Sequence, residues 1–114
     1  MTIADPRFAA ELVTRTGRVY TFDDAGCLAA FLRDGISSRS VASIWVNDFT
    51  RPDRLLDATT AEFVRSPGLH TPMASGLAAV PSGPAADSLR LALSGELLSW
   101  KDVLARVPDR PVSP

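Results

Sequence analysis

The stretch AELVTRTG, residues 10–17, returns later in the chain in a second version, AEFVRSPG, at residues 61–68. Four of the eight positions are identical at one fixed offset, namely the Ala, the Glu, the Val and the Gly. Each version joins a short apolar run to a glycine at a turn position, which is typical of a strand entering a hairpin. Repeated sequence at a fixed offset indicates an internal repeat. The order of elements around the two stretches supplies a second argument for it.

Around the first stretch, the sequence predicts three strands and one helix. Alternating and β-branched apolar residues favour strands, and apolar residues three and four positions apart favour a helix. The predicted strands are Phe8–Val13, Arg18–Phe22 and Val41–Val46, and the helix is Asp24–Arg33, with Asp23 as its N-cap and Gly35 at its end.

Around the second stretch, the same order is predicted again. The strands are Ala61–Arg65, Met73–Val80 and Glu96–Ser99, and Pro84–Leu93 is the helix. Ser99 and Asp102 then predict the capped start of a last helix, Trp100–Val107.

These elements predict an α+β fold made of a tandem of two small strand-strand-helix-strand (ββαβ) units. The first unit covers residues 1–50, and the second covers 51–107 together with the last helix. The turn-rich segment Asn47–Asp53 is expected to connect them. Residues 108–114 contain three prolines and are expected to form a disordered tail.

Composition excludes several classes of function. The 114 residues carry 12 basic and 13 acidic side chains, so no basic surface is expected for nucleic acid. The single cysteine excludes an intramolecular disulfide. The chain has neither a signal peptide pattern nor an apolar stretch of about 20 residues, so no membrane span is expected.

Catalytic constellations are excluded by counting. His70 is the only histidine and Cys27 the only cysteine, so a nucleophile with a histidine base and an orienting group is hard to assemble. No glycine-rich phosphate loop is present. The carboxylates of Asp23 and Asp24 could hold a hard cation, but helix capping is favoured. We therefore expect that the chain is not an enzyme.

What remains is a small set of soft donor atoms, which suits Cu(I). The candidate metal ligands are Met73, Met1, Cys27 and His70. Each has a structural alternative: Met1 is also the initiator methionine, Cys27 also fits a core position, and His70 also fits a solvated loop. Met73 follows Pro72 in a polar turn, where core packing is less expected, and is the strongest candidate.

Several islands of the sequence, in order, resemble NosL-type proteins, the accessory lipoproteins of nitrous oxide reductase. The opening MTIADPRFAA is similar to the stretch that begins at the methionine of that family's Cys-Gly-Met motif. The other islands are FDDAGCL (residues 22–28), WVNDF (45–49), LDA (56–58), and FVRS (63–66) followed by TPMASG (71–76). The resemblance covers residues 1–80, and its strength lies in the ordered set, because no single island is decisive.

The resemblance implies the tandem ββαβ fold, distantly similar to organomercurial lyase, and a copper chaperone function. It implies Cu(I) as the bound ion and a copper-accepting protein or transporter complex of the cell envelope as the partner. In the family the protein is a periplasmic, membrane-anchored lipoprotein. Met1 stands at the methionine of the Cys-Gly-Met motif, Met73 at the methionine of the Thr-Pro-Met island, and Cys27 at the cysteine of its own island, as ligand or core residue.

Two features depart from the family pattern. The motif cysteine and the lipoprotein signal that should precede Met1 are missing, which indicates a truncated or misassigned start or the loss of a copper ligand. The role of His70 is not inherited, because the family pattern predicts a basic residue there. Two alternatives therefore stay open, a metal-free interaction domain with a degenerate site and an organomercurial-lyase-like enzyme. The enzyme is disfavoured because such a lyase needs paired thiolates.

Overall fold

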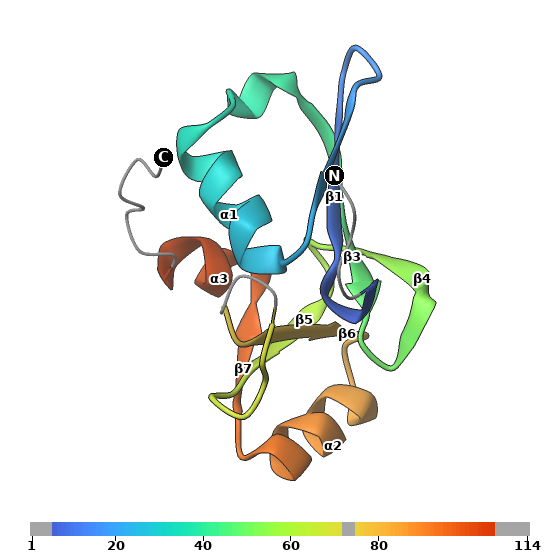
Figure 1. Ribbon diagram of the computed structural model, residues 1–114, viewed down its shortest axis with the longest axis vertical. Coiled ribbons are helices and arrows are strands. Elements are labelled where there is room, and N and C mark those ends of the chain that lie inside the picture. Colours follow the sequence, from blue (N-terminus) through green and yellow to red (C-terminus); the bar gives the residue numbers. More distant parts are fainter. Residues whose placement is uncertain (1–5, 72–74, 107–114) are drawn as a thin grey trace.

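The computed structural model describes residues 6–71 and 75–106. In this part, the chain forms two antiparallel sheets and three α-helices (Figure 1), which confirms the predicted α+β class. The strands are β1 (Ala10–Thr14), β2 (Val19–Phe22), β3 (Val41–Asp48), β4 (Arg51–Asp57), β5 (Glu62–Arg65), β6 (Leu77–Val80) and β7 (Glu96–Ser99). The helices are α1 (Ala25–Asp34), α2 (Pro84–Leu93) and α3 (Trp100–Arg106), with short 3-10 turns η1 (Pro6–Phe8) and η2 (Ser38–Ser40).

The first sheet has the strand order β2-β1-β3-β4. One of its two inner strands, β1, buries every second side chain, as the alternation of its sequence requires. The β1–β2 hairpin is tight because Gly17 has a φ of +90°, a backbone conformation that favours glycine. Helix α1 connects β2 to β3 and buries Leu28 and Ala29 in the core.

The edge strand β4 corrects the sequence analysis, which expected a connecting segment at Asn47–Asp53. Strand β3 continues to Asp48, and the chain turns back at once because Asp48 Oδ1 accepts hydrogen bonds from Thr50 N and Thr50 Oγ1, at 2.8 and 2.6 Å. Pro52 is tolerated because β4 lies at the edge of the sheet. The residues of β4, which the sequence analysis placed in the second unit without predicting a strand, therefore pair with β3 of the first sheet. The division into two units stays a prediction.

The second sheet has the strand order β6-β5-β7, with β5 at its centre. Strand β6 was expected over Met73–Val80, but it begins at Leu77. Just before it, Gly76 has a φ of +69°, which does not fit a strand, and residues 72–74 lie outside the described residues. Helix α2 connects β6 to β7 over the predicted residues.

Apart from a smaller cluster of Val64, Val80 and Ala86, most buried apolar side chains form one core between the sheets and helices. It contains Leu12 and Val46 of the first sheet, Leu28 of α1, and Phe63 and Leu98 of the second sheet. Helices α1 and α3 lie near each other beside this core, while α2 lies at the opposite end of the second sheet (Figure 1). The two sheets therefore share their buried side chains.

The ends of two helices test the predicted caps. Helix α1 is capped by Asp24 and not by Asp23, because the Asp24 carboxylate accepts from Gly26 N. The predicted cap of α3 is confirmed: Asp102 N donates to Ser99 Oγ at 3.2 Å, and Ser99 N donates to Asp102 Oδ2 at 3.1 Å.

The expected tail, residues 108–114, lies outside the described part of the chain. None of the described helices has the length and apolar character that crossing a bilayer requires.

Candidate functional site

The carboxylate of Asp24 joins two distant segments of the chain. Asp24 is fully buried, and its Oδ1 accepts from Gly26 N at 2.6 Å, in the first turn of α1. Its Oδ2 accepts from Ser75 N at 3.3 Å, in the loop between β5 and β6. One side chain thus caps the helix and holds the loop.

Gly26 lets this loop lie directly against the first turn of α1. A Cβ at position 26 would lie 2.7 Å from Ser75 Cβ, closer than two carbon atoms can approach. Cys27 is the next residue of the same turn, and its backbone N–H donates to Asp24 O at 3.1 Å. The Cys27 side chain is partly buried. The island that contains Cys27 and the island that contains Ser75 are therefore packed together.

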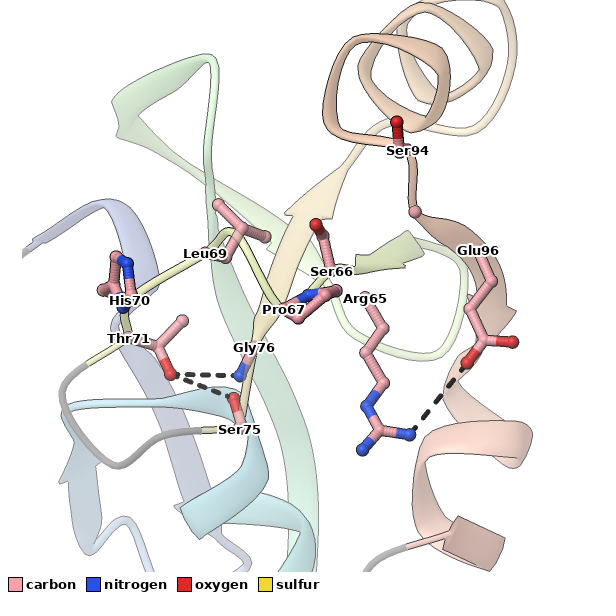
Figure 2. A pocket seen from close by; sticks show the side chains of 11 residues that line it. Arg65, Ser66, Pro67, Leu69, His70, Thr71, Ser75, Gly76, Ser94 and Glu96 are labelled. Carbon is pink, nitrogen blue, oxygen red and sulfur yellow. Dashed lines mark hydrogen bonds and ion pairs between the residues drawn. The ribbon is translucent and has the colours of Figure 1, made fainter.

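The loop is closed by two hydroxyl-bearing residues, Thr71 and Ser75. Thr71 Oγ1 accepts from Gly76 N at 3.2 Å and lies 3.4 Å from Ser75 Oγ, as Figure 2 shows. Ser75 Oγ also accepts from Leu77 N at 3.3 Å. Met73 stands between these closing residues in the sequence, but it lies outside the described residues.

A pocket of about 640 Å³ lies beside this loop. It is lined by the end of β5, the β5–β6 loop and the turn between α2 and β7 (Figure 2). Two exposed charged side chains, Arg65 and Glu96, point toward each other with Nη1 and Oε1 4.0 Å apart. Glu96 Oε1 also pairs with Arg106 Nη1 at 2.7 Å. The described lining offers oxygen and nitrogen atoms and no sulfur, so the pocket by itself does not suit Cu(I).

The candidate ligands do not all meet in the described part of the structure. Cys27 lies in the first turn of α1, and His70 is an exposed residue of the β5–β6 loop that lines the pocket. Met1 and Met73 lie outside the described residues. Within residues 6–71 and 75–106, no three His, Cys, Asp or Glu side chains gather as a metal site. What the structure brings together is the turn of Cys27 and the loop segment just after Met73.

Sequence reasoning missed the contribution of Asp24, Gly26 and Ser75. It named Asp23 as the helix cap, considered Asp23 and Asp24 together as a hard-cation site with helix capping favoured, and gave no role to Gly26 or Ser75. The available signal was a small residue in each island, next to Cys27 and two residues after Met73. Small residues mark places where backbones approach closely.

Comparisons with known proteins identify the family and the fold. The NosL family model matches residues 1–107 of the chain. The crystal structure of the copper chaperone NosL from Shewanella denitrificans has a similar fold, with a TM-score of 0.72 and 20% sequence identity. That similarity covers 82% of this chain and 76% of the Shewanella chain. No curated protein sequence matches the chain.

The family match covers nearly the whole chain, including both islands that meet at Asp24. It also agrees with the prediction that the protein is not an enzyme, because the NosL family is a non-enzymatic family of copper chaperones. The chain belongs to the NosL family.

Proposed function

We propose that this protein binds Cu(I) and delivers it to a copper-accepting protein or transporter complex of the cell envelope. The observation that carries the proposal is the contact between Gly26 and Ser75. Cys27 follows Gly26 directly, and Met73 precedes Ser75 by two residues. In the sequence, a cysteine and a methionine therefore stand next to the two segments that this contact joins.

The donor chemistry supports Cu(I) over harder ions. A thiolate and a thioether are soft ligands, which Cu(I) prefers, whereas Mg²⁺ and Ca²⁺ prefer oxygen ligands. The buried carboxylate in this region, that of Asp24, already accepts backbone hydrogen bonds at both of its oxygens. We propose Met73 and Cys27 as the central ligands. Met1 and His70 complete the proposed set, His70 from the exposed part of the same loop as Met73.

A site with few ligands on a loop also suits transfer. The ligands of an acceptor can then displace the donors one at a time, without unfolding the carrier. The Shewanella protein of similar fold is a copper chaperone, which supports this function here. We further propose the finer family features for this chain: nitrous oxide reductase as the client, a periplasmic location with a lipid anchor, and an origin by duplication of a ββαβ unit.

A competitive titration of Cu(I) against a chromophoric chelator tests the proposal. We expect about one Cu(I) per chain and weaker binding of Zn(II), because soft thioether and thiolate donors discriminate in that direction. Zinc binding equal to or tighter than copper binding would contradict a copper chaperone. Absence of any metal binding would favour the metal-free interaction domain.

Substitution of Met73 tests the ligand assignment. Met73→Leu preserves volume and apolar character, so it should change stability by less than about 1.5 kcal/mol, while Cu(I) binding weakens clearly. Cys27→Ala separates the two interpretations of the cysteine: a ligand loses copper affinity on substitution, and a core residue loses mainly stability. Unchanged affinity in Met73→Leu would remove Met73 from the site.

A further inference from the structure

The first sheet has one face that the rest of the described chain leaves uncovered. Its inner face carries Leu12 of β1 and Val46 of β3 and packs against α1 (Figure 1). Neighbouring residues of a strand point to opposite faces, so Glu11 and Trp45 point outward. In the described structure, the outward-pointing side chains at the paired positions are all at least partly exposed: Glu11, Val13, Val19, Thr21, Ser43, Trp45, Asn47, Leu55 and Asp57.

Three of these residues form a row across the sheet. Glu11 of β1 lies directly opposite Trp45 of β3, and Trp45 lies directly opposite Asp57 of β4. Adjacent strands are about 4.8 Å apart, so one carboxylate flanks the tryptophan on each side. The indole is held in place, because Trp45 Nε1 donates to Ser43 Oγ at 2.9 Å. The outer face thus presents an aromatic ring between two acidic side chains.

The negative charge of this row is not compensated within the described residues, where neither Glu11 nor Asp57 forms an ion pair. Asp57 Oδ1 accepts from Thr59 Oγ1 at 2.6 Å and from Thr59 N at 2.9 Å. These hydrogen bonds lower the pKa of Asp57, so its carboxylate is charged at neutral pH. An aromatic ring beside uncompensated carboxylates attracts a cation, since both the ring face and the carboxylates are negative.

Apolar side chains surround the row. The described structure exposes three large apolar side chains, and two of them, Val19 and Leu55, lie on this face, 52% and 47% exposed. Val19 lies opposite Val13 of β1, and Leu55 lies opposite Asn47 of β3. A face that combines a tryptophan, exposed apolar side chains and a few charges has the composition of a protein interface.

We propose that the row of Glu11, Trp45 and Asp57 is a docking point for an arginine side chain of a partner protein. A guanidinium stacks on the face of an indole, and its forked N–H groups donate to carboxylates. A lysine ammonium lacks this planar, forked shape. The row contains none of the proposed copper ligands, so the inference goes beyond Cu(I) binding and does not depend on it.

A fluorescently labelled hexa-arginine peptide tests the carboxylates, with fluorescence anisotropy as the measurement on the full chain. The double variant Glu11→Gln with Asp57→Asn should bind the peptide about tenfold more weakly, because each exposed ion pair contributes a few-fold. Both substitutions preserve side-chain size, and the asparagine oxygen can still accept from Thr59. The control, Glu62→Gln with Asp87→Asn, removes the same charge from β5 and α2 and should bind within about twofold of the unsubstituted protein.

The same assay tests the aromatic ring. Trp45→Leu should weaken binding of the hexa-arginine peptide about threefold, because the stacking contact is lost. A hexa-lysine peptide of equal charge should bind the unsubstituted protein more weakly than hexa-arginine does. The difference between the two peptides should shrink in Trp45→Leu.

Nuclear magnetic resonance locates the contact without any change to the row. On addition of hexa-arginine, the indole N–H resonance of Trp45 should shift, while that of Trp100, which is 6% exposed, should stay in place. The variant Trp100→Phe assigns the two resonances. This measurement decides the question if the substituted rows do not fold.

Four results would overturn the inference. They are equal binding of hexa-arginine by the row variant and its control, equal binding of hexa-arginine and hexa-lysine, an unshifted Trp45 resonance, and self-association through this face. Sedimentation at increasing protein concentration tests the last of these. A dimer that Glu11→Gln with Asp57→Asn abolishes would place a second copy of the chain on the face. Failure of Cu(I) binding would overturn the proposed function and leave this inference standing.

Discussion

At the scale of single residues, carboxylates organise this protein by accepting backbone hydrogen bonds. Asp24, Asp48 and Asp102 each accept from a backbone N–H two or more residues away, and each fixes a place where the chain changes direction. The fully buried Asp24 also spans two elements. Asp102 is exposed and acts locally, and the hydrogen bonds that it accepts lower its pKa.

Asp102 provides a prediction about pH. Hydrogen bonds from the backbone N–H and then the hydroxyl of Ser99 lower the pKa of Asp102 from its ordinary value of 3.8. The unfolded chain therefore takes up this proton at a higher pH than the folded chain, so the stabilisation is complete above pH 3.8 and is lost as pH falls through the lower folded pKa. Asp102→Asn should be less stable than the unsubstituted protein at pH 7.

The difference in unfolding free energy should shrink as pH falls below about 4, and urea denaturation from pH 7 to pH 2.5 measures it. A difference in unfolding free energy that stays constant over this range would show that the charge of Asp102 does not contribute to stability. Asp57, whose pKa is lowered by hydrogen bonds from the Thr59 hydroxyl and backbone, should behave in the same direction.

At the scale of elements, the two repeated stretches end in different connections. After β1 the chain turns at Gly17, whereas after β5 it makes a longer loop from residue 66 to residue 76. The loop carries His70 and the closing residues Thr71 and Ser75, so the proposed chemistry lies where the second stretch departs from the first.

The sequence predicts most elements because their patterns are local. Ser99 predicts the cap of α3, and Pro84 predicts the start of α2. The short segment that ends at Ser99 predicts β7. Strand β4 was missed because its side chains are mostly exposed and Pro52 suggests a turn. The link from Asp24 to Ser75 could not be predicted, since it joins residues 51 positions apart and depends on how the two sheets pack.

Two glycine substitutions test the difference between the connections. Gly17 and Gly76 both have positive φ, so alanine should cost about 1 kcal/mol or more of backbone strain at either position. At Gly17 the added Cβ meets nothing within 4 Å, but at Gly76 it lies 3.0 Å from Ser66 O. Gly76→Ala should therefore be the more destabilising, as measured by thermal or urea unfolding.

The affinity for Cu(I) should also differ between Gly17→Ala and Gly76→Ala. Gly17→Ala changes a hairpin far from the β5–β6 loop in the chain and should leave Cu(I) affinity unchanged. Gly76→Ala disturbs the residue whose backbone N–H donates to Thr71, so it should weaken Cu(I) binding. Equal copper affinities in the two variants would argue that the loop base has no part in binding.

At the scale of the whole molecule, the core is shared between the sheets. Phe63 of β5 is fully buried, and its ring lies 5.5 Å from that of Trp100, at the start of α3. The same cluster contains Leu12 of β1 and Leu28 of α1. The predicted division at residue 50 is therefore a proposal about how the fold arose, and the buried contacts favour a single cooperative unit.

The two tryptophans allow this cooperativity to be measured. Trp45 lies in β3 of the first sheet, and Trp100 begins α3 beside the second sheet, so each reports on one half. In the single-tryptophan variants Trp100→Phe and Trp45→Phe, urea unfolding followed by fluorescence should be one two-state transition in each. Adding Phe63→Leu to either variant should lower stability by about 1 to 2 kcal/mol.

Because Phe63 belongs to the second sheet but packs in the common core, its substitution should shift the transition reported by Trp45 as much as the one reported by Trp100. Circular dichroism of the same samples provides a probe that does not depend on either tryptophan. A transition at Trp45 that stays in place while the one at Trp100 moves would show two independently folding halves, and the 1–50 and 51–107 units would then be domains in the physical sense.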